Sequence, residues 1–301
     1  MRRVTIATPA QPGPGNIHVA LADHLFEEHG VNAVEEPVAS GMKALDALLE
    51  LRADLAVVAD TPIVMHTLKG RKLCIIATIY ESRKGLAVLA RSDRGIERPA
   101  DLSGKRIGVT FGTNAQFFLE TMLLVHGVPE KNATIVNIAS EDLVSSVKSG
   151  RVDAVTVFNP HLANLSTDRA FPHRPFYGEE LYKFRFNLVA TQEYAKANQQ
   201  LLDRVVASLV KASDVIRAEP GRARKIISQA SNTDDAVIGT VFNPNDYHVH
   251  LDQSLLLALE DQSRWAIRRK LVGATTLPDY LNHVDMGPLT RIDPSAVTII
   301  R

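Results

Sequence analysis

The residues of this chain that could do chemistry lie in short polar loops, each placed after a predicted strand. The apolar run 105–110 is typical of a buried strand, and the loop after it brings Gly112, Thr113 and Asn114 to a helix predicted from Ala115. A helix N-terminus has unpaired backbone N–H groups and a partial positive charge, so neutral donors beside it suit an anion or a polar oxygen. The same residues can also serve only as a helix cap and a turn.

This arrangement of strand, polar loop and helix start recurs along the chain. Gln11 follows the first predicted strand, Ser40 and Gly41 follow the second, and Asp60 and Thr61 follow the third. In open α/β sheets, ligands bind outside the carboxyl ends of the strands, so the recurrence predicts a binding site there. The further candidates, each near the end of another predicted strand, are Tyr80, Glu81, Phe158 and Asn159.

The sequence contains none of the common catalytic or cofactor motifs. It has no GxSxG, HExxH, CxxC or GxxxxGK[ST], and no GxGxxG follows a strand. His248 and His250 could ligate a metal, but no acidic or cysteine ligand lies at a motif spacing, so the pattern favours a polar surface. Glu81 could act as an acid or base, although a binding-site or hinge carboxylate is the favoured interpretation. We therefore expect no metal, no cofactor and no catalytic activity.

The elements that must position these loops alternate between strand and helix. Asn16 is expected to cap a helix over 18–30, and residues 164–183 are expected to be irregular. Short β-like segments at 85–90 and 186–191 are interpreted as crossings between two lobes. The remaining predicted strands are 4–7, 31–38, 54–58, 73–79, 134–138 and 152–157, and the long C-terminal helices are 201–217, 220–230 and 252–271.

Composition limits the functions that the chain can have. Its 301 residues, 45% of them hydrophobic, suffice for two lobes with separate cores. The 34 basic and 34 acidic residues leave no positive excess of the kind that nucleic-acid binding needs. No apolar run approaches the roughly 20 residues of a membrane helix. The lone Cys74 is expected in the core, and the N-terminal residues show no secretory leader, so the chain is either cytoplasmic or processed.

Four segments, 41–70, 101–123, 140–165 and 288–300, together resemble the periplasmic solute-binding proteins of ABC importers for nitrate, sulfonates, taurine and thiamine-pyrimidine precursors. The resemblance implies an α/β, two-lobed type II periplasmic-binding-protein fold with two crossing strands and a ligand cleft between the lobes. Residues 1–90 would begin lobe 1, 91–186 would form lobe 2, and 187–301 would complete lobe 1. By position, the ligand loops of the family correspond to Gln11, Ser40, Asp60-Thr61, Thr113-Asn114 and Asn159.

The resemblance also implies a function. We expect a monomeric periplasmic protein that captures a small polar or anionic organic solute (a sulfonate, nitrate, a carboxylate or a pyrimidine) by hinge closure and presents it to a membrane permease. No basic residue lies in the ligand loops, but Arg83, Arg91 and Arg185 lie near the crossings. One alternative is a lyase or dehydratase on the same fold, with Glu81 or Asn159 as the base. The other is a ligand-sensing domain.

Overall fold

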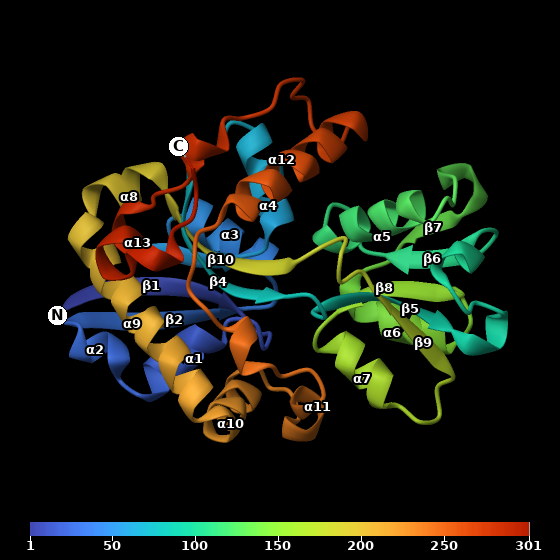
Figure 1. Ribbon diagram of the computed structural model, residues 1–301, viewed down its shortest axis with the longest axis horizontal. Coiled ribbons are helices and arrows are strands. Elements are labelled where there is room, and N and C mark those ends of the chain that lie inside the picture. The colour runs from blue at the N-terminus through green and yellow to red at the C-terminus, as the bar shows by residue number, and fades with distance from the viewer. Residues whose placement is uncertain (301) are drawn as a thin grey trace. The chain divides into compact units, whose positions relative to one another are not determined.

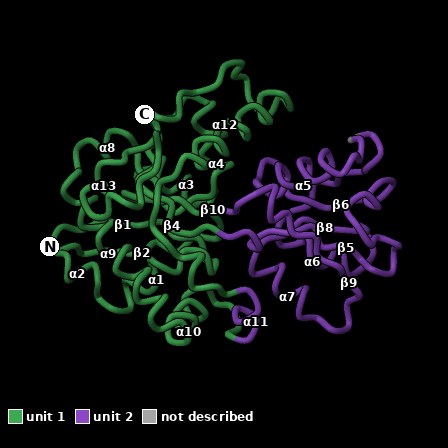
Figure 2. The backbone as a smooth tube through the Cα atoms, viewed as in Figure 1, with its two compact units in different colours: residues 1–81, 185–235, 242–301 green, residues 82–184, 236–241 purple. Residues whose placement is uncertain are grey.

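The computed structural model describes residues 1–300, apart from the side chain of Glu130, and the chain divides into two compact units (Figures 1 and 2). Unit 1 contains residues 1–81, 185–235 and those from 242 onward. Unit 2 contains residues 82–184 and 236–241. Each unit is built on its own five-stranded sheet. None of the described helices is both long enough and apolar enough to cross a membrane.

The sheet of unit 1 has the order β2-β1-β3-β10-β4. Its strands are β1 (Arg2–Pro9), β2 (Val31–Val38), β3 (Leu55–Val58), β4 (Leu73–Ser82) and β10 (Phe184–Thr191). β1 runs parallel to β2 and β3, and β10 runs antiparallel to β3. All four residues of β3 are buried, as expected for a strand covered on both faces.

The helices of unit 1 pack in two groups around this sheet (Figure 1). The long α9 contacts α1, α2, α10 and α13, while α4 contacts both α3 and α12. Helix α9 is amphipathic, and its buried side is apolar. The helices are α1 (Gly15–Ala22), α2 (Leu25–Glu28), α3 (Gly41–Leu49), α4 (Asp60–Leu68), α8 (Gln192–Ala197), α9 (Gln199–Ala218), α10 (Pro220–Ala230), α12 (Gln253–Arg268) and α13 (Gly287–Ile292), with α11 (Asp235–Gly239) at the boundary with unit 2.

The helix predicted over 18–30 is wrong in two respects. It is divided into α1 and α2, because the chain turns at His24, whose φ of 55° lies in the left-handed region. Its N-cap is Pro14, so the helix begins earlier than predicted, directly from the proline-rich turn. The side chain of Asn16 therefore lies inside the helix and donates to Ser213 Oγ at 2.8 Å instead of capping it.

The sheet of unit 2 has the order β7-β6-β8-β5-β9. Its strands are β5 (Leu86–Arg91), β6 (Arg106–Val109), β7 (Thr134–Asn137), β8 (Ala154–Phe158) and β9 (His173–Tyr177). β6 runs parallel to β7 and β8, whereas β5 runs antiparallel to β8 and β9. The helices are α5 (Asn114–Val125), α6 (Leu143–Lys148) and α7 (His161–Thr167), and the core includes Leu89, Val155, Leu162 and Phe171.

Two segments of unit 2 differ from the sequence-based expectation. Residues 164–183, predicted to be irregular, contain the end of α7 and the whole of β9. Only Phe176 of β9 is buried, so the strand has no apolar alternation to reveal it and is defined by pairing with β5. The segment 85–90, expected at a crossing, lies in β5, which pairs on both sides within unit 2. The compact units change at 81/82, 184/185, 235/236 and 241/242. The lobe bounds at 90/91 and 186/187 stay a prediction.

Short 3₁₀ helices complete both units. They are η1 (Ser92–Arg94), η2 (Pro99–Leu102), η3 (Glu130–Asn132), η4 (Ser140–Asp142), η5 (Pro244–Asp246), η6 (Tyr280–His283) and η7 (Pro294–Ala296). Of these, η5 leads into the segment that contains His248 and His250.

Candidate functional site

The topology of unit 1 brings its predicted loops to one edge of the sheet. Because β1, β2 and β3 are parallel, the loops that follow them leave the sheet at the same edge. β10 begins at this edge, since Asn187 pairs with Val58 at the end of β3. β4 ends there too, because Glu81 at its end accepts a hydrogen bond from Arg185 Nε at 2.8 Å.

An aromatic cluster lies beneath these loops. The Tyr80 ring centroid lies 6.3 Å from that of Phe186 and 5.0 Å from that of Tyr247. The loop after β1 passes so close that a Cβ placed on Gly13 would lie 2.4 Å from Phe186 Cδ2, and one on Gly41 would lie 3.7 Å from the same ring. The cluster therefore joins the ends of β1, β2, β4 and β10.

Tyr247 is a residue of this cluster that sequence reasoning missed. Its hydroxyl donates to the carbonyl of Pro12 at 3.1 Å, which holds the loop after β1 in place. Burial raises the pKa of Tyr247 well above its ordinary value, so the phenol keeps its proton and remains a donor. Tyr247 directly precedes His248, in a stretch of sequence whose evident signal is its two histidines.

The first predicted ligand residues of unit 1 lie at this edge with different roles. Gln11 is buried, and its backbone N–H donates to the carbonyl of Pro9 at 2.7 Å. Ser40 caps α3, because its Oγ accepts from the N–H of Lys43 at 3.3 Å. Gly41 is the first residue of that helix. A capping oxygen that accepts one hydrogen bond still has its own proton to donate, so Ser40 retains a donor.

Asp60 and Thr61 lie in a buried polar network. Both are fully buried; Asp60 Oδ1 accepts from Asn187 Nδ2 at 2.8 Å, and Thr61 Oγ1 donates to Gln262 Oε1. Burial raises the pKa of Asp60, and the nearby Arg185 opposes that shift. Both predicted ligand residues thus have partners in the interior of unit 1, so a role in holding a solute stays a prediction for them.

The three arginines considered as partners for an anion all contact other protein groups. Arg185 is buried, with Nη1 at 3.6 Å from Asp60 Oδ2 in addition to its bond to Glu81. Arg91 binds Asp93 and two backbone carbonyls, and Arg83 donates to a carbonyl. An anion bound by the predicted ligand loops would therefore depend mainly on neutral donors.

The corresponding edge of unit 2 carries the loop with Gly112, Thr113 and Asn114. β6 and β8 are parallel neighbours, so the loop after each leaves the sheet at the same edge. Gly112 has a φ of 73°, which favours glycine, and its N–H donates to Gln116 Oε1 at 2.8 Å. Thr113 is the N-cap of α5, but its hydroxyl donates to the carbonyl of Thr110 at 2.7 Å and makes no capping bond.

Two amide side chains at this edge have buried polar atoms without a partner. Asn114, the first residue of α5, is 5% exposed, and its Nδ2 has no hydrogen-bond partner within residues 1–300. Asn159 Oδ1, at the end of β8, is in the same situation. Such a group costs about 1–3 kcal/mol unless a water or a ligand satisfies it. Both residues were predicted from the sequence to contact the ligand.

Other side chains complete this edge of unit 2. Phe158 is half-buried, and its ring centroid lies 6.5 Å from that of His161, whose pKa is lowered by burial. Asn137 was missed in the sequence, yet its Oδ1 accepts from the N–H of Phe111 at 3.0 Å and so holds the loop before α5. The signal that could have found it is its position at the end of β7, beside β6.

Cys74 is the single cysteine of the sequence. The residue is buried in β4, as predicted, and burial raises its pKa to about 12. The thiolate, which is the nucleophilic form, is therefore scarce at neutral pH.

Two units, each with polar loops at the carboxyl ends of parallel strands, define the chain as a protein with the periplasmic binding protein fold. More specifically, it belongs to the NMT1/THI5-like family, whose sequence profile matches residues 11–223. The predicted fold class is confirmed by the crystal structure of the periplasmic aliphatic sulphonate binding protein SsuA from Escherichia coli. That structure has a TM-score of 0.83 and 17% identity, covering 96% of this chain and 99% of that one.

Two further proteins are similar. The alkanesulfonate-binding protein SsuA from Xanthomonas axonopodis pv. citri, bound to MOPS, has a TM-score of 0.80 and 20% identity, covering 95% of this chain and 98% of that one. A putative aliphatic sulfonates-binding protein of Bacillus subtilis (strain 168) is 23% identical over 253 residues, which are 82% of this chain and 75% of that protein.

Proposed function

We propose that this chain is the solute-binding component of an ABC importer and that its solute is a small organic sulfonate. Three features support the proposal: membership of the family, the fold, and relatives that are named for sulfonates. A sulfonate group presents three oxygens that accept hydrogen bonds, and it keeps its negative charge at any physiological pH. Neutral donors and a helix N-terminus suit such a group.

The observation that carries the proposal is the start of α5. Its N-cap hydroxyl donates to a backbone carbonyl and makes no capping bond, so this side chain leaves the N–H groups of Asn114 and Ala115 uncapped. The buried Nδ2 of Asn114 lies at the same helix end and has no partner among the described residues. Together they form a cluster of donors that a sulfonate oxygen would satisfy. Ligand roles for Gln11, Ser40, Gly41, Asp60, Thr61, Tyr80, Glu81, Gly112, Phe158 and Asn159 stay predictions, as do the ligand cleft and the hinge closure.

A thermal-shift screen followed by calorimetric titration tests the proposal. The ligand set is taurine, short alkanesulfonates, nitrate, small carboxylates and pyrimidines. We expect sulfonates to raise the unfolding temperature, because a ligand that binds only the folded state stabilises it by RT ln(1 + [L]/Kd), about 2.7 kcal/mol at 100 times Kd. Stabilisation by nitrate or pyrimidines but not by sulfonates would contradict the solute class, and no stabilisation by any compound would contradict the binding function.

The transporter partner and the location follow from the same proposal. A binding protein of this kind would deliver its solute to a membrane permease, and in a bacterium with two membranes it would do so from the periplasm. The alternative, an enzyme on this fold, is separated by incubating the protein with each ligand that binds. Recovery of unchanged ligand by mass spectrometry supports binding alone, and conversion of the ligand would assign the chain to the enzymes.

A further inference from the structure

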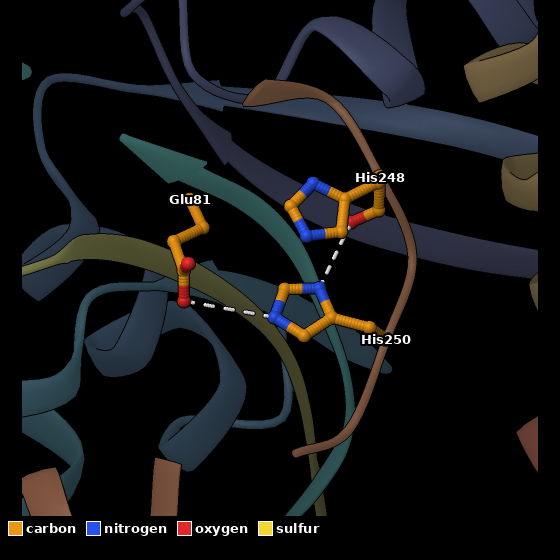
Figure 3. A group of neighbouring side chains, drawn as sticks. All are labelled: Glu81, His248 and His250. Carbon is orange, nitrogen blue, oxygen red and sulfur yellow. Dashed lines mark hydrogen bonds and ion pairs between the residues drawn. The ribbon is translucent and has the colours of Figure 1, made fainter. Parts of the chain in front are cut away.

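Glu81 comes together with His248 and His250 in unit 1, although it lies far from the two histidines in sequence (Figure 3). Each offers one ligand atom, and these three atoms all lie within 4.8 Å of one another. The sequence around the two histidines has no acidic or cysteine ligand at a motif spacing, whereas the fold supplies Glu81 from the end of β4. All three residues belong to unit 1, whereas Thr113 and Asn114, at the start of α5, belong to unit 2.

The backbone fixes the positions of these ligands. His250 pairs with Thr78 of β4 through two backbone hydrogen bonds, of 2.9 and 3.0 Å, which places the histidine beside the end of that strand. His248 lies two residues earlier, and its ring stacks on that of His250 with centroids 4.1 Å apart and an angle of 14°. Side chains two residues apart in extended chain share a side, so both rings face Glu81.

Each of the three side chains is also oriented by another protein group. His248 Nδ1 lies 3.0 Å from the carbonyl oxygen of Asn245, and His250 Nδ1 lies 3.4 Å from that of His248. A carbonyl oxygen only accepts, so in the neutral rings Nδ1 carries the proton and Nε2 keeps its lone pair. Arg185 Nε holds the Glu81 carboxylate at 2.8 Å. Partners of this kind orient the ligands of most metal sites in proteins.

We propose that Glu81, His248 and His250 form a binding site for a divalent transition-metal ion, with Zn²⁺ as the best match. Two imidazole nitrogens and one carboxylate oxygen suit Zn²⁺, whereas Mg²⁺ and Ca²⁺ prefer oxygen ligands throughout. In a tetrahedral zinc site the ligand atoms lie about 3.3 Å apart, so small side-chain rotations would close the present arrangement around the ion. The fourth position would take a water molecule.

The charges around the site are compatible with a cation. Arg185 is a positive group in contact with Glu81, and it is shared between Glu81 and Asp60. Asp252 adds a further carboxylate, with Oδ2 at 3.9 Å from His250 Nε2. The competing arrangement has no metal: His250 Nε2, at 3.6 Å from Glu81 Oε2, is protonated and forms an ion pair with that carboxylate.

Zinc titration of the full chain, after treatment with a chelator, distinguishes these arrangements. Competition with a chromogenic chelator gives stoichiometry and affinity, and visible absorption of the Co²⁺ form reports the coordination. We expect the wild type to bind one ion per chain. We expect His248→Ala and His250→Ala to lose zinc affinity by more than roughly 10- to 100-fold, which is the loss that follows removal of a group that only orients a ligand. Both variants leave the Glu81–Arg185 pair intact.

His24→Ala is the matched control. Its Nδ1 also lies 3.6 Å from a carboxylate oxygen, that of Glu27, but the side chain is 79% exposed and belongs to no three-ligand group within the described residues. We expect this variant to bind zinc as the wild type does. Circular dichroism checks that each variant is folded. If the His250→Ala variant does not fold, the zinc affinity of the His248→Ala variant decides the outcome, because His248 is only half-buried. No bound ion, or equal binding by wild type and the folded His248 variant, would overturn the proposal.

Discussion

At the scale of single residues, Asn114 shows how a neutral side chain can mark a binding site for an anion. Its amide is buried at the N-terminus of α5, and its Nδ2 lacks a partner within the described chain. Folding gives this donor no protein partner, which is unfavourable unless a water or a ligand bonds to it. A ligand oxygen in that place would restore the bond. If Asn114 holds the proposed solute, it costs stability in the absence of ligand and contributes affinity in its presence.

We predict that Asn114→Ala weakens sulfonate binding without destabilising the ligand-free protein. The variant removes a donor to a buried ligand oxygen, which corresponds to about 1–3 kcal/mol or roughly 5- to 150-fold in Kd. It breaks no described hydrogen bond of the amide nitrogen, so the free energy of unfolding should stay the same or rise slightly. Calorimetric titration and urea unfolding measure the two quantities. Unchanged affinity would remove Asn114 from the site.

Thr113→Val is the matched comparison in the neighbouring residue. It keeps the shape of the side chain but removes the hydroxyl that donates to Thr110 at 2.7 Å, so we expect a stability loss of about 0.5–1.5 kcal/mol. Its proton is already used, and the hydroxyl can offer a ligand only its lone pairs, which an anion cannot use. We therefore expect a smaller loss of affinity in this variant than in Asn114→Ala. A larger loss of affinity in Thr113→Val than in Asn114→Ala would assign the main donor role to Thr113.

At the scale of elements, close packing at the edge of the unit 1 sheet requires a glycine. A Cβ on Gly13 would lie 2.4 Å from Phe186 Cδ2 and 3.3 Å from Tyr80 Cδ1. Phe186 is only 2% exposed, so its ring has little room to move. The close approach lets the loop after β1 lie directly on the aromatic cluster.

We predict that Gly13→Ala lowers the free energy of unfolding by about 1–3 kcal/mol, the usual effect of overpacking. Gly221→Ala is the control, because a Cβ at this position in α10 meets no atom within 4 Å, and alanine favours a helix by about 0.5–1 kcal/mol. Urea unfolding of both variants compares them under the same conditions. Equal stability of Gly13→Ala and wild type would show that the loop can move off the ring.

The elements also show what could and could not be read from the sequence. α10 was predicted with its observed bounds, and β3 and α9 were found from their apolar patterns, because each pattern reflects burial of the element itself. β9 was missed because its strand character comes from pairing with β5. The Glu81–His248–His250 group depends on the β-bridge between Thr78 and His250, and no local pattern predicts such a long-range contact.

The same distinction applies to the candidate ligand loops. Strand ends can be located from hydrophobic runs, so Thr113, Asn114 and Asn159 were identified before the fold was known. Which polar atoms remain without a partner depends on the whole packing of unit 2. The sequence could therefore name Asp60 and Asn114 on equal grounds, while the structure gives Asp60 interior partners and leaves Asn114 Nδ2 without one.

At the scale of the whole molecule, each unit contains a histidine whose neutral form is favoured by folding. Burial lowers the pKa of His66 in α4 of unit 1, and nearby Lys69 and Arg71 lower it further, although Asp46 acts in the opposite direction. Burial likewise lowers the pKa of His161 at the start of α7 in unit 2, against the influence of Glu141. Unfolding exposes both rings to water, where their pKa returns to about 6.5.

The last prediction concerns the pH dependence of stability that follows from these shifts. Above about pH 6.5 both rings are neutral in the folded and unfolded states, so their contribution to stability is complete. As the pH falls through that value, the unfolded state takes up protons before the folded state does, and stability decreases. We therefore expect the unfolding temperature of ligand-free protein to fall between pH 7.5 and pH 5.5.

The size of this decrease should be smaller in His66→Gln and His161→Gln, because glutamine does not titrate. Carboxylates with lowered pKa values, such as Asp101 and Asp168, lose their stabilising effect only at more acidic pH, so they do not contribute in this window. Scanning calorimetry of wild type and both variants at the two pH values gives the comparison. An equal decrease in all three proteins would show that folding does not oppose protonation of either histidine.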